Sequence, residues 1–376
     1  MTTTAAPARP SASPNATHRI LNFSAGPAVL PEEVIRQAQQ DLWDVRGSGI
    51  GICEHSHRGP VFDAIIDEAV ADCRRLASIG DDHEVLFLQG GATLQFGMIP
   101  MNFLAADAVA DYPDTDVWTT KAIKEAQLFG RTNLAFEGAK SGYDHVPTTS
   151  ELSLSPNAAY LYYCSNNTIY GTRYDAPPKT TAPLICDASS EMFSRPVDID
   201  RHALIYAGAQ KNLGPSGVVL VIIRKDFMVK KVRKVTVMMD YEVQAKNGSR
   251  LNTPPTFGIY MMGLVFKWIL AQGGLAGMER RNDEKAKVLY DAIDGSGGFY
   301  RGVSRPECRS RMNVSFRLPS EDLEKRFLKE AAAQGMDGLK GHRDAGGIRA
   351  SIYNAFPKSG CEALASFMKS FVAKNG

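Results

Sequence analysis

The sequence predicts an α/β protein with a mixed, mostly parallel seven-stranded sheet covered by helices, followed by a smaller C-terminal α/β domain. Three observations lead to this fold class. Apolar runs of strand length alternate with segments of helical periodicity. Several runs are apolar at every position, which is typical of parallel strands buried on both faces. Only 11 residues, 207–217, separate the last two runs, so that pair is expected to be antiparallel.

Two amphipathic helices open the folded part of the chain. The first begins at Pro31 and carries apolar residues at helical spacing as far as Val45, and the second runs from about Phe62 to Leu76. The strands and intervening helices follow in order. Strands are expected at 85–88, 116–118, 133–136, 160–164, 184–186, 204–206 and 218–223, and helices at 94–104 and 121–129.

The apolar stretch at 257–271 is expected to be a buried helix, because it is shorter than the ~18–20 residues that cross a bilayer. It ends a large domain, 19–274, whose first residues, 19–35, are expected to form an arm toward the small domain. The small domain, 275–376, begins with a charged helix and has short strands near 312–317 and 348–353. Residues 1–18, rich in Thr, Ala, Pro and Ser, predict a disordered tail, with a short organelle presequence as the alternative.

Composition excludes several classes of function. Lys and Arg number 43 against 41 Asp and Glu, a balance that argues against a nucleic-acid partner. The six cysteines show no C-x-x-C spacing, which argues against a zinc or dithiol redox site and favours a reducing compartment. We therefore expect a cytoplasmic protein that uses no metal and no membrane.

A possible phosphate site lies where an expected strand gives way to a helix, in the segment FLQGGATLQF. Gly90 and Gly91 form the turn, and Ala92 and Thr93 begin the helix. The unpaired N–H groups at a helix start bind phosphate well. Glycines in such a turn also have a purely conformational use, and the spacing matches neither a P-loop nor a dinucleotide-binding fingerprint.

Two further polar residues follow buried strands of the same expected sheet. Lys211, in the segment YAGAQKNLGPSG, is a surface charge or, if desolvated, a nucleophile. Asp187, in CDASS, is a helix cap or a functional carboxylate. The carboxyl ends of parallel strands meet at one sheet edge, where such folds bind ligands. A phosphate cup, a carboxylate and an amine at that edge are the groups that pyridoxal phosphate needs.

Aromatic and basic residues complete the set of candidates. Trp118, at the end of the expected strand 116–118, could stack on a planar cofactor or fill the core. Two His-Arg pairs stand in glycine-flanked turns, and a further arginine lies in an expected strand. Guanidinium groups pair with carboxylate or phosphate, so they could frame a doubly anionic substrate, although each alone could be a solvated surface charge. These residues are His57, Arg58, His342, Arg343 and Arg349.

From about Asn22 onward, the chain resembles the phosphoserine aminotransferases, a family of fold-type I, class V pyridoxal-phosphate enzymes. The resemblance rests on several segments in the same order rather than on one motif. The segments are NFSAGPAVLP at 22–31, SHRG at 56–59, FLQGGATLQF at 87–96, CSNNTIYG at 164–171, CDASS at 186–190, YAGAQKNLGPSG at 206–217, LNTPPTFGIY at 251–260 and LKGHRDAGGIRASIYNA at 339–355.

The resemblance implies roles toward pyridoxal 5′-phosphate. Lys211 would form the covalent link to the cofactor aldehyde, Asp187 would pair with the pyridine nitrogen, and Trp118 would stack on the ring. Thr168 would hydrogen-bond near the phenolic oxygen. The cofactor phosphate would be held by Ala92, Thr93 and Gln210 of one chain and by Asn252 and Thr253 of the partner chain, because the family is homodimeric with its sites at the interface.

It also implies a reaction and its substrates. Glutamate would give its amino group to 3-phosphohydroxypyruvate, forming O-phospho-L-serine and 2-oxoglutarate in L-serine biosynthesis. The sequence leaves open whether 4-phosphooxy-threonine of pyridoxine synthesis is a further substrate. Arg349 would bind the substrate α-carboxylate. The second anionic group would meet His342 and Arg343, together with His57 and Arg58 of the partner chain.

Two departures and two rival readings remain. Members of the family carry Arg where Thr93 stands and a second Ser where Ala25 stands, so phosphate selectivity is in question. Another class V transaminase, such as one acting on alanine or serine with glyoxylate, would not need the basic cluster. A desulfurase would need a catalytic cysteine on a mobile loop, and nothing marks one of the six cysteines for that role. A catalytically silent dimeric binding protein would keep the fold without the activity.

Overall fold

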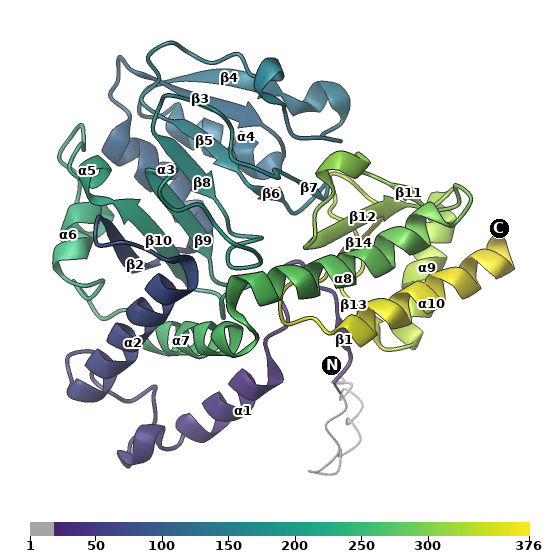
Figure 1. Cartoon of the computed structure of the whole chain (residues 1–376), viewed down its shortest axis with the longest axis horizontal. Coiled ribbons are helices and arrows are strands. Elements are labelled where there is room, and N and C mark those ends of the chain that lie inside the picture. Colours follow the sequence, from purple (N-terminus) through teal and green to yellow (C-terminus); the bar gives the residue numbers. More distant parts are fainter. Residues whose placement is uncertain (1–18) are drawn as a thin grey trace, which may run out of the picture.

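The computed structural model describes residues 19–376, so the expected tail at 1–18 lies outside the described residues. Its centre is a seven-stranded sheet in the order β2-β10-β9-β8-β5-β3-β4 (Figure 1). Strand β10 is antiparallel to β2 and β9, and the remaining pairs are parallel, which confirms the mixed, mostly parallel sheet. The strands are β2 (His83–Gln89), β3 (Val109–Asp114), β4 (Arg131–Glu137), β5 (Leu161–Cys164), β8 (Leu184–Asp187), β9 (Leu204–Gly208) and β10 (Val218–Arg224).

Helices cover both faces of this sheet, which explains the runs without alternation. Along β2, Val85 and Phe87 join one core with helices α2 and α7, whereas Leu86 and Leu88 join the opposite core with α3 and α4. Side chains of a strand point alternately to the two faces, so two apolar layers demand an uninterrupted apolar strand. The large unit contains helices α1 (Glu32–Asp41), α2 (Pro60–Ala77), α3 (Gly91–Phe103), α4 (Val117–Ala126), α5 (Lys225–Met228), α6 (Tyr241–Lys246) and α7 (Thr256–Ala271).

One predicted strand was wrong. The chain is helical, not extended, from Val117 onward, and the strand lies earlier, at β3. Strand β3 was missed because its sequence, VADYPD, contains a proline and aspartates, which are unfavourable in strands. The structure accommodates them: the register shifts between Tyr112 and Pro113, and buried Asp111 accepts hydrogen bonds from Asn133 and Ser155.

The smaller unit packs three helices against a three-stranded sheet in the order β11-β12-β14. The N-terminal segment belongs to this unit in space, because β1 pairs with β13 and Phe23 lies in the same core. Figure 1 shows α8 running from the large sheet to the small unit, beside α10. The elements are β1 (Leu21–Asn22), α8 (Gly274–Asp294), β11 (Arg301–Gly302), β12 (Asn313–Arg317), α9 (Glu321–Ala333), β13 (Met336–Asp337), β14 (Ile348–Ser351) and α10 (Lys358–Asn375), and a two-stranded ribbon of β6 (Asn166–Asn167) and β7 (Thr172–Arg173) lies near the junction.

The apolar segment predicted at 257–271 is helix α7, and it packs against α2 and the sheet. Within residues 19–376, no single helix has the length and apolar character of a membrane span. Among these residues only α7 and α8 taken together combine that length with that apolar character, and the pair is bent by 81° at the break between the two helices.

Candidate active site

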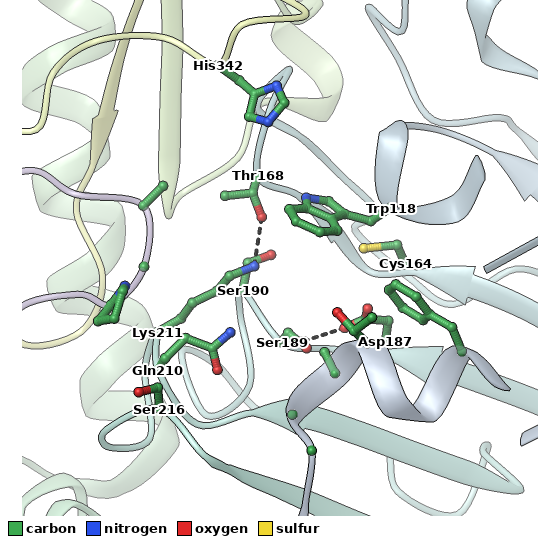
Figure 2. Close-up of a pocket in the computed structure, with 18 of the residues that line it drawn as sticks. Trp118, Cys164, Thr168, Asp187, Ser189, Ser190, Gln210, Lys211, Ser216 and His342 are labelled. Atoms are coloured by element: carbon green, nitrogen blue, oxygen red, sulfur yellow. Dashed lines mark hydrogen bonds between the residues drawn. The ribbon is translucent and has the colours of Figure 1, made fainter. Parts of the chain in front are cut away.

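A cavity of about 590 Å³ opens at the edge of the large sheet where its parallel strands end. This is the edge at which α/β sheets bind their ligands, and the volume is in the range of small-molecule sites. Figure 2 shows the side chains that converge on it. The lining residues are Ala25, Gly26, Pro27, Gly90, Gly91, Ala92, Thr93, Phe96, Trp118, Cys164, Thr168, Asp187, Ser189, Ser190, Gln210, Lys211, Ser216, Gly217, His342 and Arg349.

Lys211 enters this cavity from the turn after β9. Its Nζ donates a 2.9 Å hydrogen bond to Thr168 Oγ1 and lies 6.0 Å from the centre of the Trp118 ring (Figure 2). On its other side the backbone of Gly26 comes close, since a Cβ there would be 3.5 Å from Lys211 Cγ, and Gly26 has a φ of +144°. The amine is therefore held by one weak neutral partner, and no carboxylate forms an ion pair with it among the described residues.

Asp187, the last residue of β8, is buried at the base of the cavity with 4% of its surface exposed. Tyr206 donates a 2.9 Å hydrogen bond to Oδ2, and the backbone N–H of Ser189 donates one of 2.9 Å to Oδ1. Burial, reinforced by the Asp187 charge, raises the pKa of Tyr206 well above its usual value, so this phenol stays a donor. These two hydrogen bonds fix the carboxylate in orientation.

Helix α3 begins at the opposite wall. Gly90 and Gly91 have φ values of +87° and +63°, and a Cβ at Gly90 would clash with Leu94. This left-handed turn sends the chain from β2 into the helix, so the backbone N–H groups around Ala92 and Thr93 form the free helix start. The positive end of the helix dipole adds to its affinity for an anion.

Trp118 reaches the cavity from the first turn of α4, where it lies because Asp116 caps the helix. Asp116 Oδ1 accepts hydrogen bonds from Trp118 N (2.7 Å) and Thr119 N (3.3 Å). Its other oxygen, Oδ2, is buried without a partner, as is the indole Nε1 of Trp118. Burial raises the pKa of Asp116 to about 7, despite the two backbone donors and the positive charge of Lys211.

Basic side chains from the small unit form the remaining side. Arg349, on β14, donates a 3.2 Å hydrogen bond from Nη1 to the Thr168 carbonyl, and its Nε is buried without a partner. His342, in the turn before β14, has its Nδ1 3.2 Å from Asp344. Burial lowers the pKa of His342, and the charges of nearby cations, Arg349 among them, act in the same direction.

The structure brings most of the candidate residues together. Those that line one cavity are Ala92, Thr93, Trp118, Thr168, Asp187, Gln210, Lys211, His342 and Arg349. The remaining candidates do not line the cavity of their own chain: Arg343 is exposed beside His342, and the others lie elsewhere on the large unit. These others are His57, Arg58, Asn252 and Thr253.

Several lining residues were not predicted as site residues from the sequence. Ser189 donates its backbone N–H to Asp187, and its hydroxyl accepts from Gly208 N. Ser190 is tied by its hydroxyl to Asn166. The signal was present in the segment CDASS, where two serines follow the aspartate directly. The contribution of the arm, Ala25 to Pro27, depends on the chain returning from the small unit and has no local signal.

The residues around the cavity fit pyridoxal phosphate. A buried carboxylate, an unpaired amine, a free helix start and an aromatic face are the complements of its ring nitrogen, aldehyde, phosphate and π-surface. The unpartnered Arg349 Nε and Trp118 Nε1 are further donors without an acceptor. A buried donor without an acceptor is costly in a finished site, which indicates that a polar ligand belongs here.

Comparisons with known proteins agree with this reading. Residues 20–364 match the model of the class V aminotransferase family. A phosphoserine aminotransferase of Herpetosiphon aurantiacus is 52% identical over 95% of this chain and 99% of its own, and a chloroplastic one of Arabidopsis thaliana is 48% identical over 97% and 85%. The solved structure of the enzyme of Bacillus circulans subsp. alkalophilus superposes with a TM-score of 0.93 at 49% identity, covering 95% of this chain and 99% of that one.

Proposed function

Because the chain belongs to the class V aminotransferases and, within them, to the phosphoserine aminotransferases, we propose that it transfers the amino group of glutamate to 3-phosphohydroxypyruvate. The products are O-phospho-L-serine and 2-oxoglutarate, and the two half-reactions alternate in a reversible ping-pong cycle in L-serine biosynthesis. The observation that carries the proposal is the convergence of Lys211, Asp187 and Arg349 on one cavity.

When bound, pyridoxal phosphate supplies an aldehyde that accepts the amine and a ring that takes up electrons from the substrate Cα. Asp187 holds a proton on the ring nitrogen, since Tyr206 and Ser189 N fix its carboxylate. The free amine of Lys211 moves the substrate Cα proton as general base, then general acid. Among residues 19–376, its one hydrogen-bond partner is the hydroxyl of Thr168, which the amine leaves in order to act.

Substrate recognition falls to the basic residues. Arg349 binds the α-carboxylate with the guanidinium nitrogens that protein groups leave free. His342 and Arg343 receive the phosphate or the side-chain carboxylate of glutamate. With Thr93 at the helix start in place of an arginine, this selectivity depends more heavily on the His-Arg pairs.

The active unit in this proposal is a homodimer in which the partner completes the site. His57, Arg58, Asn252 and Thr253 lie outside the cavity of their own chain, and a partner chain would bring them to it. The apolar side chains exposed between α1 and α2, among them Trp43 with 87% of its surface exposed, are suited to burial in such an interface. Sedimentation of the holoenzyme as a monomer would contradict this part of the proposal.

We also place the enzyme in the cytoplasm. All six cysteines are free in the structure, and five of them are buried, as is usual in a reducing compartment.

Substitution of Lys211 tests the assignment directly. Lys211→Ala should fold and bind pyridoxal phosphate but lose turnover by at least about 10³-fold, because it removes both nucleophile and base. The exposed Lys246→Ala is the matched control and should keep full activity. Borohydride followed by peptide mass spectrometry should place the label on position 211. Multiple turnovers by Lys211→Ala would refute the proposal.

A substrate panel tests the specificity. Glutamate and alanine as donors, with hydroxypyruvate and its 3-phosphate as acceptors, separate this function from that of a glyoxylate-dependent transaminase. The phosphorylated acceptor should be preferred by at least about 10²-fold, since its phosphate would form charge-assisted hydrogen bonds with the His-Arg pairs that hydroxypyruvate cannot form. Equal rates with and without the phosphate would favour the rival.

A further inference from the structure

Lys285 is a buried cation that the proposed chemistry does not use. It lies in the middle of α8, where this helix passes from the large to the small unit, and 2% of its surface is exposed. No carboxylate pairs with it within the described part of the chain. A buried ammonium without an anion is destabilising, and an apolar side chain of the same length would fill the space at less cost. Its presence therefore calls for a compensating role.

Its ammonium binds the backbone that leaves β14. Nζ donates to the carbonyl oxygens of Ile352 (2.9 Å) and Tyr353 (2.7 Å), with that of Asn354 at the 3.5 Å limit. These carbonyls lie beyond the end of β14 and before α10, where no ladder or helix satisfies them, although that of Tyr353 also accepts a hydrogen bond from the N–H of Phe356 (2.8 Å). One ammonium has three donors, so it can serve all three.

The segment held in this way touches two walls of the active site. The Tyr353 hydroxyl donates a 2.7 Å hydrogen bond to the carbonyl of Ala25, which precedes Gly26 and Pro27 at the cavity. Asn354 N donates 3.0 Å to the side-chain oxygen of Asn212, the residue after Lys211. The same strand carries Arg349 into the cavity.

A second residue of α8 acts on the segment from the same helix face. Asn282, one turn before Lys285, donates a 2.8 Å hydrogen bond to Asn354 Oδ1, and Asn354 Nδ2 donates 2.9 Å to the carbonyl of Phe193 in the large unit. The exit of β14 is thus fixed on one side by α8 and on the other by the large unit.

We propose that Lys285 is a positioning residue whose ammonium holds the segment 352–354, and through it sets Arg349 and the Lys211 turn in their places around the cofactor. A neutral amine has two N–H donors and a lone pair, so it leaves one carbonyl unsatisfied and turns a lone pair toward it. The hydrogen bonds that hold the segment 352–354 are therefore fewer and weaker when Lys285 loses its proton.

The proton is lost in an accessible pH range. Burial lowers the pKa of Lys285 to about 7. Of the groups around it, the Cys361 thiol of α10 acts to raise this pKa and Arg281 of α8 acts to lower it. The segment 352–354 carries the Tyr353 phenol and no charged side chain. The positioning effect should be strong below pH 7 and decline above it.

The test compares Lys285→Met with the matched control Lys287→Met, an exposed lysine of the same helix that pairs with Asp291. Pyridoxal phosphate is titrated into each apo-protein from pH 6 to pH 9. At pH 6, Lys285→Met should bind it about tenfold more weakly than wild type, as expected for loss of hydrogen bonds to a charged group. The deficit should shrink toward pH 9, where the wild-type amine is neutral but keeps two of its donors, whereas Lys287→Met should match wild type throughout.

Two results would overturn the proposal: equal affinity at pH 6, or a deficit that stays constant with pH, which marks a packing defect alone. In steady state, Lys285→Met should raise KM for glutamate at low pH with kcat changed less than about threefold. This kinetic readout rests on the proposed function, whereas cofactor titration does not require turnover.

If Lys285→Met does not fold, hydrogen exchange on wild-type apo-protein replaces it. After correction for intrinsic rates, amides in 350–356 should exchange faster at pH 9 than at pH 6, relative to those of β9. Unchanged protection would reject the role of Lys285 without touching the assignment of the activity.

Discussion

The floor and the rim of the cavity are built in different ways. The floor, which comprises Thr168, Asp187 and Lys211, follows the ends of buried strands, and each side chain has a defined hydrogen-bond partner. The rim, which comprises His342 and Arg343, stands in a turn between two strands of the small unit, and Arg343 has 86% of its side chain exposed. Arg349 lies between them, half-buried and partly satisfied. The side chains of the floor are thus held by hydrogen bonds, whereas the exposed Arg343 of the rim keeps free donors that could meet an anion.

The largest effect should come from the floor. Asp187→Asn keeps the shape of the side chain but removes the carboxylate that would pair with the ring nitrogen of the cofactor, so kcat should fall by at least about 10²-fold. Tyr206→Phe removes only the donor to Asp187 Oδ2 and should cost less. Single-turnover absorbance measurements would follow both. A wild-type kcat in Asp187→Asn would break the distinction between floor and rim.

The second effect concerns the group between the two regions. Arg349→Gln should raise KM for both amino donor and keto acceptor by about 10- to 100-fold, the range for hydrogen bonds to a charged group. The exposed Arg326→Gln, which loses only a pair with Glu330, serves as control. If KM is unchanged in Arg349→Gln, another residue binds the α-carboxylate.

A smaller, pH-dependent effect is expected at the rim. Because burial lowers the pKa of His342, its ring is neutral at pH 7 and gains a charge only on acidification. Phosphate binding favours the charged form, so the affinity for a phosphorylated substrate should rise severalfold as pH falls from 7 to 5.5. Comparing Ki for phosphoserine in wild type and His342→Asn isolates this residue. The same pH profile in both proteins would assign the effect elsewhere.

The smallest effect on activity is expected for Asp116→Asn, behind the floor, where the substitution should change the pH dependence of stability instead. Its native pKa, about 7, lies above that of an unfolded aspartate, so the native chain binds the extra proton and loses stability as pH rises from about 4 to 7. Asp116→Asn keeps an oxygen for the helix cap but cannot ionise. Its free energy of unfolding relative to wild type should therefore improve by up to about 4 kcal/mol over that range. Urea unfolding at several pH values measures this. A pH-independent difference would show that Asp116 does not titrate as a buried carboxyl.

The fold class could be predicted because its signals are local. The apolar runs of β5, β8, β9 and β10 are bounded by turn residues, and the short link between β9 and β10 indicates their antiparallel pairing. Strand β3 lacks such an apolar run and was therefore missed. Its Pro113 is accommodated by a register shift, and its Asp111 by hydrogen bonds from side chains far away in the sequence. Val117 to Thr120 have strand propensity, yet the Asp116 cap starts a helix there.

For the site, residues at strand ends were accessible to sequence reasoning and residues brought by the tertiary fold were not. Three of the strands predicted from apolar runs are followed closely by candidate residues, namely Lys211, Asp187 and the turn at Gly90. Nothing in the local sequence of Gly26 indicates that it lies beside Lys211, because pairing of β1 with β13 places it there. Lys285 resembles any other lysine of a charged helix until its burial is known.

The sequence by itself determined the fold class, most of the strands and helices, and the sheet edge at which candidate polar residues gather, because periodicity and strand-end residues depend on neighbours in the chain. Tertiary structure alone decided which cations are buried, which donors lack partners and how the two units meet at the cavity. Those properties depend on desolvation and on contacts between residues more than 100 positions apart, such as Arg349 with Thr168 and Asn354 with Asn212.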